Sequence, residues 1–211
     1  YLRPFSREAV VTLIDAPKEG FDGWWYGGAL APDGCIYYVP GGAKQVLRFD
    51  PATEERKLIG PEITKIEGID KYLGCVRADD GVLYGIPCRA HHVLKIDVDA
   101  KEISLMDTDL SEYGDNKWIG GALGSDSCIY GTPACASKVL KIDAREQKVS
   151  TLDTDLGEGK WRWCGGALGS DDVIYAMPHD ADGRQVLRID IKAQTAETIG
   201  PDFGDEAEKW K

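Results

Sequence analysis

The sequence predicts an all-β fold built from consecutive copies of a four-stranded unit. The first observation is a phrase, Trp-Ile-Gly-Gly-Ala-Leu-Gly-Ser-Asp-Ser-Cys-Ile-Tyr, which begins at Trp118 and returns almost unchanged at Trp163. The second is its period, because the tyrosines that close the phrase stand at positions 37, 84, 130 and 175, in steps of 47, 46 and 45 residues. The third is that no capped segment sustains the apolar i, i+3, i+4 spacing of a helix. A period in this range is typical of stacked or radially arranged units.

Each unit opens with its first strand, Gly-Gly-Ala-Leu or a variant, followed by a tight turn. Glycines in this strand would let the first strands of neighbouring units approach closely, where larger side chains would collide. Asp-Gly is a strong hairpin signal because both central positions tolerate positive φ. The last two units lack the glycine, so their turns cost more conformational energy. The four predicted turns are Asp33-Gly34, Asp80-Gly81, Asp126-Ser127 and Asp171-Asp172.

The second strand of each unit ends at a proline, which cannot donate to a strand ladder. These prolines are Pro40, Pro87, Pro133 and Pro178. The third strand is aliphatic and carries a basic residue with an aspartate two positions later, so both lie on one face. The pairs are Arg48/Asp50, Lys95/Asp97, Lys141/Asp143 and Arg188/Asp190. A catalytic pair is expected once, so four similar pairs indicate a structural salt bridge or turn hydrogen bond.

The fourth strand is the most polar and fits an outer, half-exposed position. We expect it at residues 56–59, 102–106, 148–152 and 196–199. Residues 9–14 resemble it, which predicts the outer strand of another unit. Trp210 stands 47 residues after Trp163, where a fifth unit would begin. We therefore expect one domain over residues 1–211, with units at about 25–71, 72–117, 118–162 and 163–209, and further units beyond Tyr1 or Lys211.

Four-stranded units of about 45 residues joined by polar turns resemble the blades of a β-propeller. The phrase W-x-G-G-A-L-x-x-D-x-x-I-Y-x-x-P…V-L-[KR]-I-D is similar to tandem repeats in uncharacterised proteins of bacteria and microbial eukaryotes, and in style to NHL-type and surface-layer propellers. Ile96-Asp97 resembles the Trp-Asp ending of WD blades, although their Gly-His opening is absent, and kelch repeats carry Gly-Gly after a different strand. The resemblance implies a propeller, or a segment of a larger one, with about four blades here. A parallel β-helix or other solenoid is the alternative.

Composition excludes several classes of partner. Against 25 Lys and Arg stand 36 Asp and Glu, a net charge of −11, which argues against nucleic acid and anionic membrane surfaces. No apolar run approaches the roughly 18 residues needed to cross a bilayer, so we predict no membrane insertion. Cys35 and Cys128 occupy a position that is valine in the other units, which predicts small buried side chains. No cofactor is predicted, and the compartment is left open.

Function is expected where two sets of loops meet. In a propeller, the connection into the first strand and the loop between strands two and three emerge on one face, and loops on a rigid scaffold carry function. The repeated opening aromatic is interpreted as a wedge between blades, whereas Trp24 and Trp161 lie outside the repeat. The loop after Pro178 is two residues longer than its counterparts. The predicted binding residues on this face are Trp24, Trp161, His91, His92, His179, Asp180 and Asp182.

Arg77 is a further candidate, because it replaces a leucine of the other first strands. It either presents a cation to an anionic ligand or pairs with Asp79 or Asp80. Cys88, His91 and His92 have zinc-ligand types but no fourth ligand, so no metal site is predicted.

With no nucleophile–base pair in the pattern, we predict no catalytic residues. The expected function is an interaction or binding module for a protein partner or small ligand at the loop face. The alternatives are a propeller enzyme, a lyase or hydrolase at the channel mouth, and a structural subunit of a larger assembly.

Overall fold

The computed structural model describes residues 23–63, 69–180 and 182–204. This part of the chain forms strands and one 3-10 turn, η1 Ser111–Tyr113. The strands are β1 Trp25–Leu30, β2 Ile36–Pro40, β3 Val46–Phe49, β4 Arg56–Ile59, β5 Tyr72–Arg77, β6 Leu83–Pro87, β7 Leu94–Asp97, β8 Glu102–Leu105, β9 Trp118–Leu123, β10 Cys128–Pro133, β11 Leu140–Asp143, β12 Lys148–Thr151, β13 Trp163–Leu168, β14 Val173–Pro178, β15 Val186–Asp190 and β16 Thr195–Ile199.

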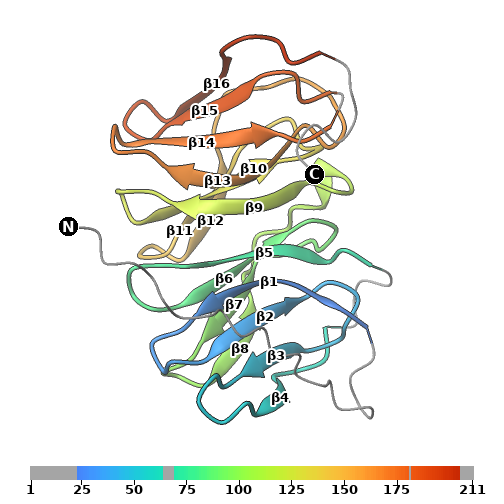
Figure 1. The fold of residues 1–211 in the computed structure, drawn as a ribbon, viewed down its shortest axis with the longest axis vertical. Coiled ribbons are helices and arrows are strands. Elements are labelled where there is room, and N and C mark those ends of the chain that lie inside the picture. Colours follow the sequence, from blue (N-terminus) through green and yellow to red (C-terminus); the bar gives the residue numbers. More distant parts are fainter. Residues whose placement is uncertain (1–22, 64–68, 181, 205–211) are drawn as a thin grey trace, which may run out of the picture.

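The strands form four antiparallel sheets, each made of four strands in chain order. Figure 1 looks onto the first strands of the sheets, which lie next to one another from β1 through β5 and β9 to β13. One repeat of the sequence therefore makes one sheet, as the period predicts. The predicted all-β architecture of four-stranded propeller blades is confirmed.

A row of glycines lets the first strands meet backbone to backbone. A Cβ built on Gly74 would lie 2.6 Å from the Cα of Gly120, and one on Gly27 would lie 2.8 Å from the Cα of Gly74. Gly120 continues the row, because its Cβ would lie 3.0 Å from the Cα of Gly165. Any larger residue would force the sheets apart, so the role predicted for these glycines is confirmed. We call this row the axial seam.

The opening aromatic of each later sheet is buried against the sheet before it. Trp118 is 0% exposed and shares a core cluster with Tyr84 and Ile86 of the preceding sheet. Its indole N–H donates to the carbonyl of Lys138 at 2.8 Å. Tyr72 and Trp163 occupy the equivalent clusters. The predicted wedge between blades is therefore confirmed, with the single polar atom of each tryptophan ring satisfied.

A second link joins neighbouring sheets near their outer strands. The Gln147 side-chain amide donates to the hydroxyl of Tyr84 at 2.9 Å, and Gln194 donates to Tyr130 at 2.7 Å. Both glutamines stand in the turn between the third and fourth strands with positive φ, 51° and 55°. Lys101 holds this position in the second sheet, with φ 56°. The first pair of sheets therefore lacks the glutamine bridge.

The recurring basic–aspartate pair forms only in part. Arg188 lies 2.9 Å from Asp190 and Arg48 lies 3.9 Å from Asp50, whereas Lys141 forms its ion pair with Asp126, at 3.7 Å. The aspartates have a shared role as turn acceptors, which Asp50, Asp97, Asp143 and Asp190 all perform for backbone N–H groups of the following turn.

Cys35 and Cys128 are buried, as predicted, and neither forms a disulfide with another described residue. Residues 9–14 and Trp210, which were expected to belong to further units, lie outside the described residues. Among the described residues, no helix is both long enough and apolar enough to cross a bilayer.

Candidate binding site on the loop face

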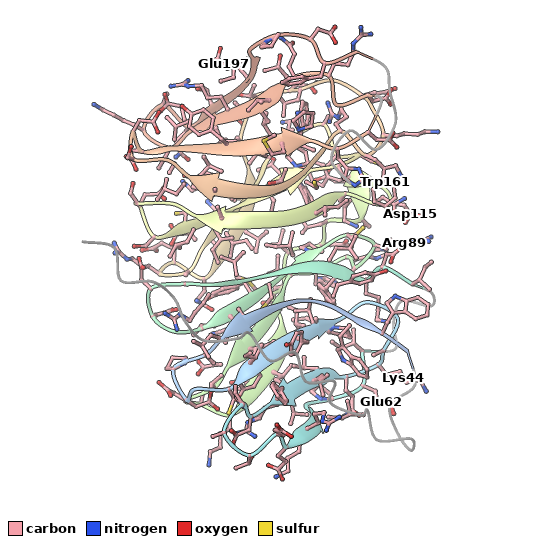
Figure 2. All side chains as sticks on the ribbon, viewed as in Figure 1. Lys44, Glu62, Arg89, Asp115, Trp161 and Glu197 are labelled. Atoms are coloured by element: carbon pink, nitrogen blue, oxygen red, sulfur yellow. The ribbon has the colours of Figure 1, made fainter. Side chains whose placement is uncertain are left out.

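Backbone hydrogen bonds bring the two predicted sets of loops to one face of the molecule. The carbonyl of Lys71 accepts from the N–H groups of Cys88 and Ala90, and the carbonyl of Lys117 accepts from those of Ala134 and Ala136. The same clamp recurs in the first and fourth sheets, at Trp24 and Arg162. Figure 2 shows Arg89, Asp115 and Trp161 at one edge of the molecule, where these segments lie. We call this surface the loop face.

One position in each clamp has a left-handed backbone. The residues there are Gly23, Asp70, Asn116 and Trp161, with φ of 99°, 63°, 52° and 50°. Glycine, aspartate and asparagine adopt this conformation readily, but a bulky side chain costs about 1–2 kcal/mol. Trp161 is therefore the strained member of the set. Such strain is concentrated at functional sites, where surrounding contacts hold it in place.

In three of the four sheets, the residue that follows this position is a buried cation. Lys71, Lys117 and Arg162 are only 2%, 0% and 3% exposed, and burial lowers the pKa of all three. The Lys117 amine donates to the carbonyl of Gly114 at 3.1 Å, and Arg162 donates to that of Leu156 at 2.8 Å. These residues were missed in the sequence, although the signal was present as a basic residue before three opening aromatics. Trp24 holds this position in the first sheet.

A pocket of about 800 Å³ opens on the loop face between the third and fourth sheets. Its lining residues are Asp115, Asn116, Cys135, Glu158, Gly159, Lys160, Trp161 and Asp182. The carboxylate of Asp182 accepts from the backbone N–H of Lys160 at 2.8 Å, which joins the two walls. Arg89 pairs with Asp115 at 2.9 Å on the rim. Glu158 and Asp182 thus line the same pocket as a half-buried tryptophan, Trp161.

Two buried polar atoms close to Trp161 lack hydrogen-bond partners among the described residues. Among the described residues, the buried side-chain nitrogens without a hydrogen-bond partner are Nε of Arg162 and Nδ1 of His179. Arg162 follows Trp161 in the chain, and the His179 ring centroid lies 6.3 Å from that of Trp161. Each unpaired buried polar atom carries a desolvation cost. The strained backbone of Trp161 and these two nitrogens therefore lie together at one corner of the loop face.

Four of the predicted site residues meet at this corner. Trp161 and Asp182 line the pocket, and His179 packs beside Trp161. The backbone N–H of Asp180 donates to the Trp161 carbonyl at 3.0 Å. The long loop after Pro178 is held here by Gly183, since a Cβ at that position would lie 1.7 Å from the Arg162 carbonyl oxygen. The extra length of the loop thus builds one wall of the pocket.

The other predicted residues lie elsewhere. Trp24 packs over Gly41 and Gly42 on the first sheet and stays 45% exposed. In the second sheet's loop, His91 is exposed, and Nδ1 of His92 lies 3.0 Å from the Met106 carbonyl oxygen.

Arg77 stands at the far end of β5 from the loop face and donates to the Leu30 carbonyl at 3.0 Å. Five residue steps along a strand amount to about 16 Å, so Arg77 is remote from the pocket.

The pocket also contains residues that sequence reasoning did not select, namely Asp115, Asn116, Cys135, Glu158 and Lys160. Asn116 was recoverable in principle, because it holds the same repeat position as Trp161. Within the described residues, no group of three His, Cys, Asp or Glu side chains could hold a metal ion. Cys88 is buried, and burial raises the pKa of its thiol to about 12, so it is protonated near neutral pH.

Comparison with solved structures agrees with the propeller architecture. Virginiamycin B lyase from Staphylococcus aureus, solved with quinupristin, superposes with a TM-score of 0.68 at 11% identity, covering 88% of this chain and 57% of that one. U3-55K gives 0.63 at 14% identity, with 85% and 53% covered. An auxiliary nutrient binding protein from Bacteroides thetaiotaomicron gives 0.59 at 14% identity, with 88% and 46% covered.

These likenesses establish the fold alone, because all three identities are far below those at which function is shared. The chain spans about half the length of these neighbours. No family model and no curated protein matches the sequence. The neighbours include a lyase, a nutrient-binding protein and U3-55K, so the architecture leaves the function open and the site must decide it.

Proposed function

We propose that this protein is a binding module, a single propeller domain over residues 1–211 that captures a positively charged ligand group in the loop-face pocket. The observation that carries the proposal is Trp161. An indole occupies a left-handed position where the other units have glycine, aspartate or asparagine. The left-handed conformation of Trp161 costs conformational energy, and stability alone does not explain why the fold keeps a tryptophan there. Trp161 also lines the pocket.

The lining favours a cationic ligand. An indole face attracts cations more strongly than other aromatic rings. Asp115 is already paired with Arg89, but Glu158 and Asp182 add two further carboxylates, against the Lys160 amine on the lining and the buried Arg162 guanidinium next to Trp161. The chain as a whole carries a net charge of −11, which would speed the encounter with a basic partner. A lysine or arginine side chain of a peptide, or an organic amine, fits these groups.

The described lining supports binding better than catalysis. It holds carboxylates, an amide, an amine and a thiol, but no histidine. His92 is turned toward the backbone carbonyls of Met106 and Thr108. Nucleophilic catalysis by the Cys135 thiol would need a base within hydrogen-bond reach, and the described residues show no such hydrogen bond of this thiol. This set of groups is suited to recognising charge and ring faces.

Calorimetric titration with Nα-acetyl-arginine amide tests the proposal, with the neutral Nα-acetyl-citrulline amide as matched probe. We expect the arginine probe to bind and the citrulline probe to bind at least tenfold more weakly, a difference of about 1.4 kcal/mol. Trp161→Asn removes the indole but introduces the residue that stands at the equivalent position before the third sheet, Asn116, in this conformation. It should weaken arginine binding by a similar factor.

Trp24→Asn is the control, because it removes another exposed tryptophan of the loop face that lies outside the pocket. It should leave arginine binding unchanged. Equal binding of both probes, or full binding by Trp161→Asn, would refute the proposal.

A further inference from the structure

Three clefts between adjoining sheets can be compared residue by residue. In the third cleft, the carboxamide of Gln194 donates through nitrogen to the Tyr130 hydroxyl at 2.7 Å and accepts through oxygen from the Lys141 amine at 2.6 Å. In the second cleft, Gln147 donates to Tyr84 at 2.9 Å. A glutamine carboxamide therefore fills both of these clefts and bonds to the tyrosine of the preceding sheet.

The first cleft has the same frame without the carboxamide. Tyr37 stands for Tyr130 and donates to Asp33 at 2.9 Å, as Tyr130 donates to Asp126 at 2.8 Å. Lys101 replaces the glutamine. Its backbone N–H donates to the Val98 carbonyl at 3.3 Å, but its side-chain amine has no hydrogen-bond or ion-pair partner among the described residues. A cavity of about 550 Å³ remains, against about 220 and 270 Å³ in the glutamine-bridged clefts.

The walls of this cavity are apolar and its rim is polar. Ile59, Ile96 and Ile103 form the walls and pack against the core between the first two sheets. Arg48 and Lys101 supply donors on the rim, and Asp33, Asp97 and Asp99 supply acceptors. A cavity of a few hundred Å³ with apolar walls and a few convergent polar groups is the usual form of a small-molecule site.

We propose that the first cleft binds a small primary carboxamide with a branched apolar body. The carboxamide takes the place that the glutamine side chain fills in the other two clefts. Its oxygen accepts from Lys101 or Arg48, its N–H groups donate toward the aspartate rim, and its apolar body covers the isoleucines. A carboxylate is disfavoured, because three carboxylates already line the cavity against two cations and it has no N–H to donate.

The test is ligand-observed and protein-observed NMR with 4-methylpentanamide on the whole chain. We expect binding with shift changes at the first cleft, and at least tenfold weaker binding of 4-methylpentanoate. Lys101→Gln introduces the residue of the third and fourth units, which should fill the cleft and reduce amide binding by about tenfold or more. Because Lys101→Gln copies residues that fold in the same turn, loss of folding is not expected, and a thermal melt confirms it.

Lys192→Gln is the matched control, since it makes the same exchange at an exposed position in the corresponding turn of the fourth sheet. It should leave amide binding unchanged. The proposal is overturned if the amide does not bind at its solubility limit, if Lys101→Gln binds it as well as the original chain, or if the carboxylate binds equally well. This cleft shares no residue with the loop-face pocket, so either site can fail without the other.

Discussion

The axial seam and the loop-face pocket are built by opposite rules. The seam uses positions that carry the same residue in every unit, so Gly27, Gly74, Gly120 and Gly165 meet one another. The pocket uses positions at which the units differ, and its most distinctive member, Trp161, replaces residues better suited to their backbone. In this repeat protein, positions that carry the same residue in every unit serve packing, and positions at which the units differ provide specific chemistry.

Two tryptophans make the contrast concrete. Trp118 is fully buried, its N–H is satisfied, and it stands at a position that is aromatic in every unit. Trp161 is half-buried in a left-handed conformation, beside two side-chain nitrogens that have no hydrogen-bond partner in the described part of the chain. Burial of the first stabilises the fold, whereas the second costs conformational energy. Substitutions at these positions should therefore separate stability from binding.

The largest effect is expected for Trp118→Ala. Removing a fully buried tryptophan from the core between the second and third sheets should lower the free energy of unfolding by about 4 kcal/mol. Chemical denaturation followed by circular dichroism measures it. Trp24→Ala, which removes a largely exposed ring, should cost less than about 1 kcal/mol. A loss of less than about 1 kcal/mol for Trp118→Ala would contradict the view that positions shared by all units serve packing.

Gly74→Ala should come next, at about 2–3 kcal/mol. Its new methyl group would collide with the backbone of Gly120, which has no side chain to rotate away. Gly166→Ala is the matched control, because there the nearest atom lies 3.3 Å away and belongs to a side chain. We expect it to change stability by less than about 1 kcal/mol. Equal denaturation midpoints for the two variants would contradict a close-packed seam.

Trp161→Asn should change stability by less than about 1 kcal/mol, since relief of the left-handed strain offsets the lost ring contacts. The same variant is expected to lose arginine binding. Denaturation measures the stability of this variant and calorimetry measures its arginine binding, so the two together distinguish Trp161 from Trp118. A large loss of stability would show that Trp161 is a packing residue like Trp118.

The smallest effect is expected from pH. Burial alone would raise the pKa of Asp33, but hydrogen bonds from the Cys35 N–H and the Tyr37 hydroxyl lower it below its ordinary value. A lowered folded-state pKa stabilises the fold above the unfolded value and ceases to do so as pH falls through the folded value. Asp33→Asn should thus be less stable near about pH 6, by under about 1 kcal/mol, and the difference should be smaller near about pH 3, below the ordinary pKa of an aspartate.

Denaturation of both proteins at the two pH values checks this expectation. A difference that grew toward acid pH would contradict the assigned direction of the pKa. The position also belongs to the shared frame, since Asp126 and Asp171 accept from Tyr130 and Tyr175 in the same way.

Local, repeated signals were sufficient to predict the fold from the sequence. The period, the Asp-turn hairpins, the strand-ending prolines and the opening aromatics each act within one unit or between neighbours, so four copies reinforced one interpretation. Even the role of Gly74 and Gly120 was predictable, because only a backbone contact explains glycine at every equivalent position. Departures from the same pattern also selected Trp161, His179, Asp180 and Asp182, which the structure places together at one corner of the loop face.

Only the tertiary structure shows which residues form the pocket, because that depends on contacts between segments far apart in the chain. The pocket takes Asp115, Cys135, Glu158 and Asp182 from four separate segments, and no local rule places them together. The same applies to Arg77, which the direction of β5 carries away from the loop face, and to Lys117 and Arg162, which packing buries. The sequence by itself determined the blade, because its hydrogen bonds and turns are local. Only the packing of blades against one another decided which unlike residues share a site.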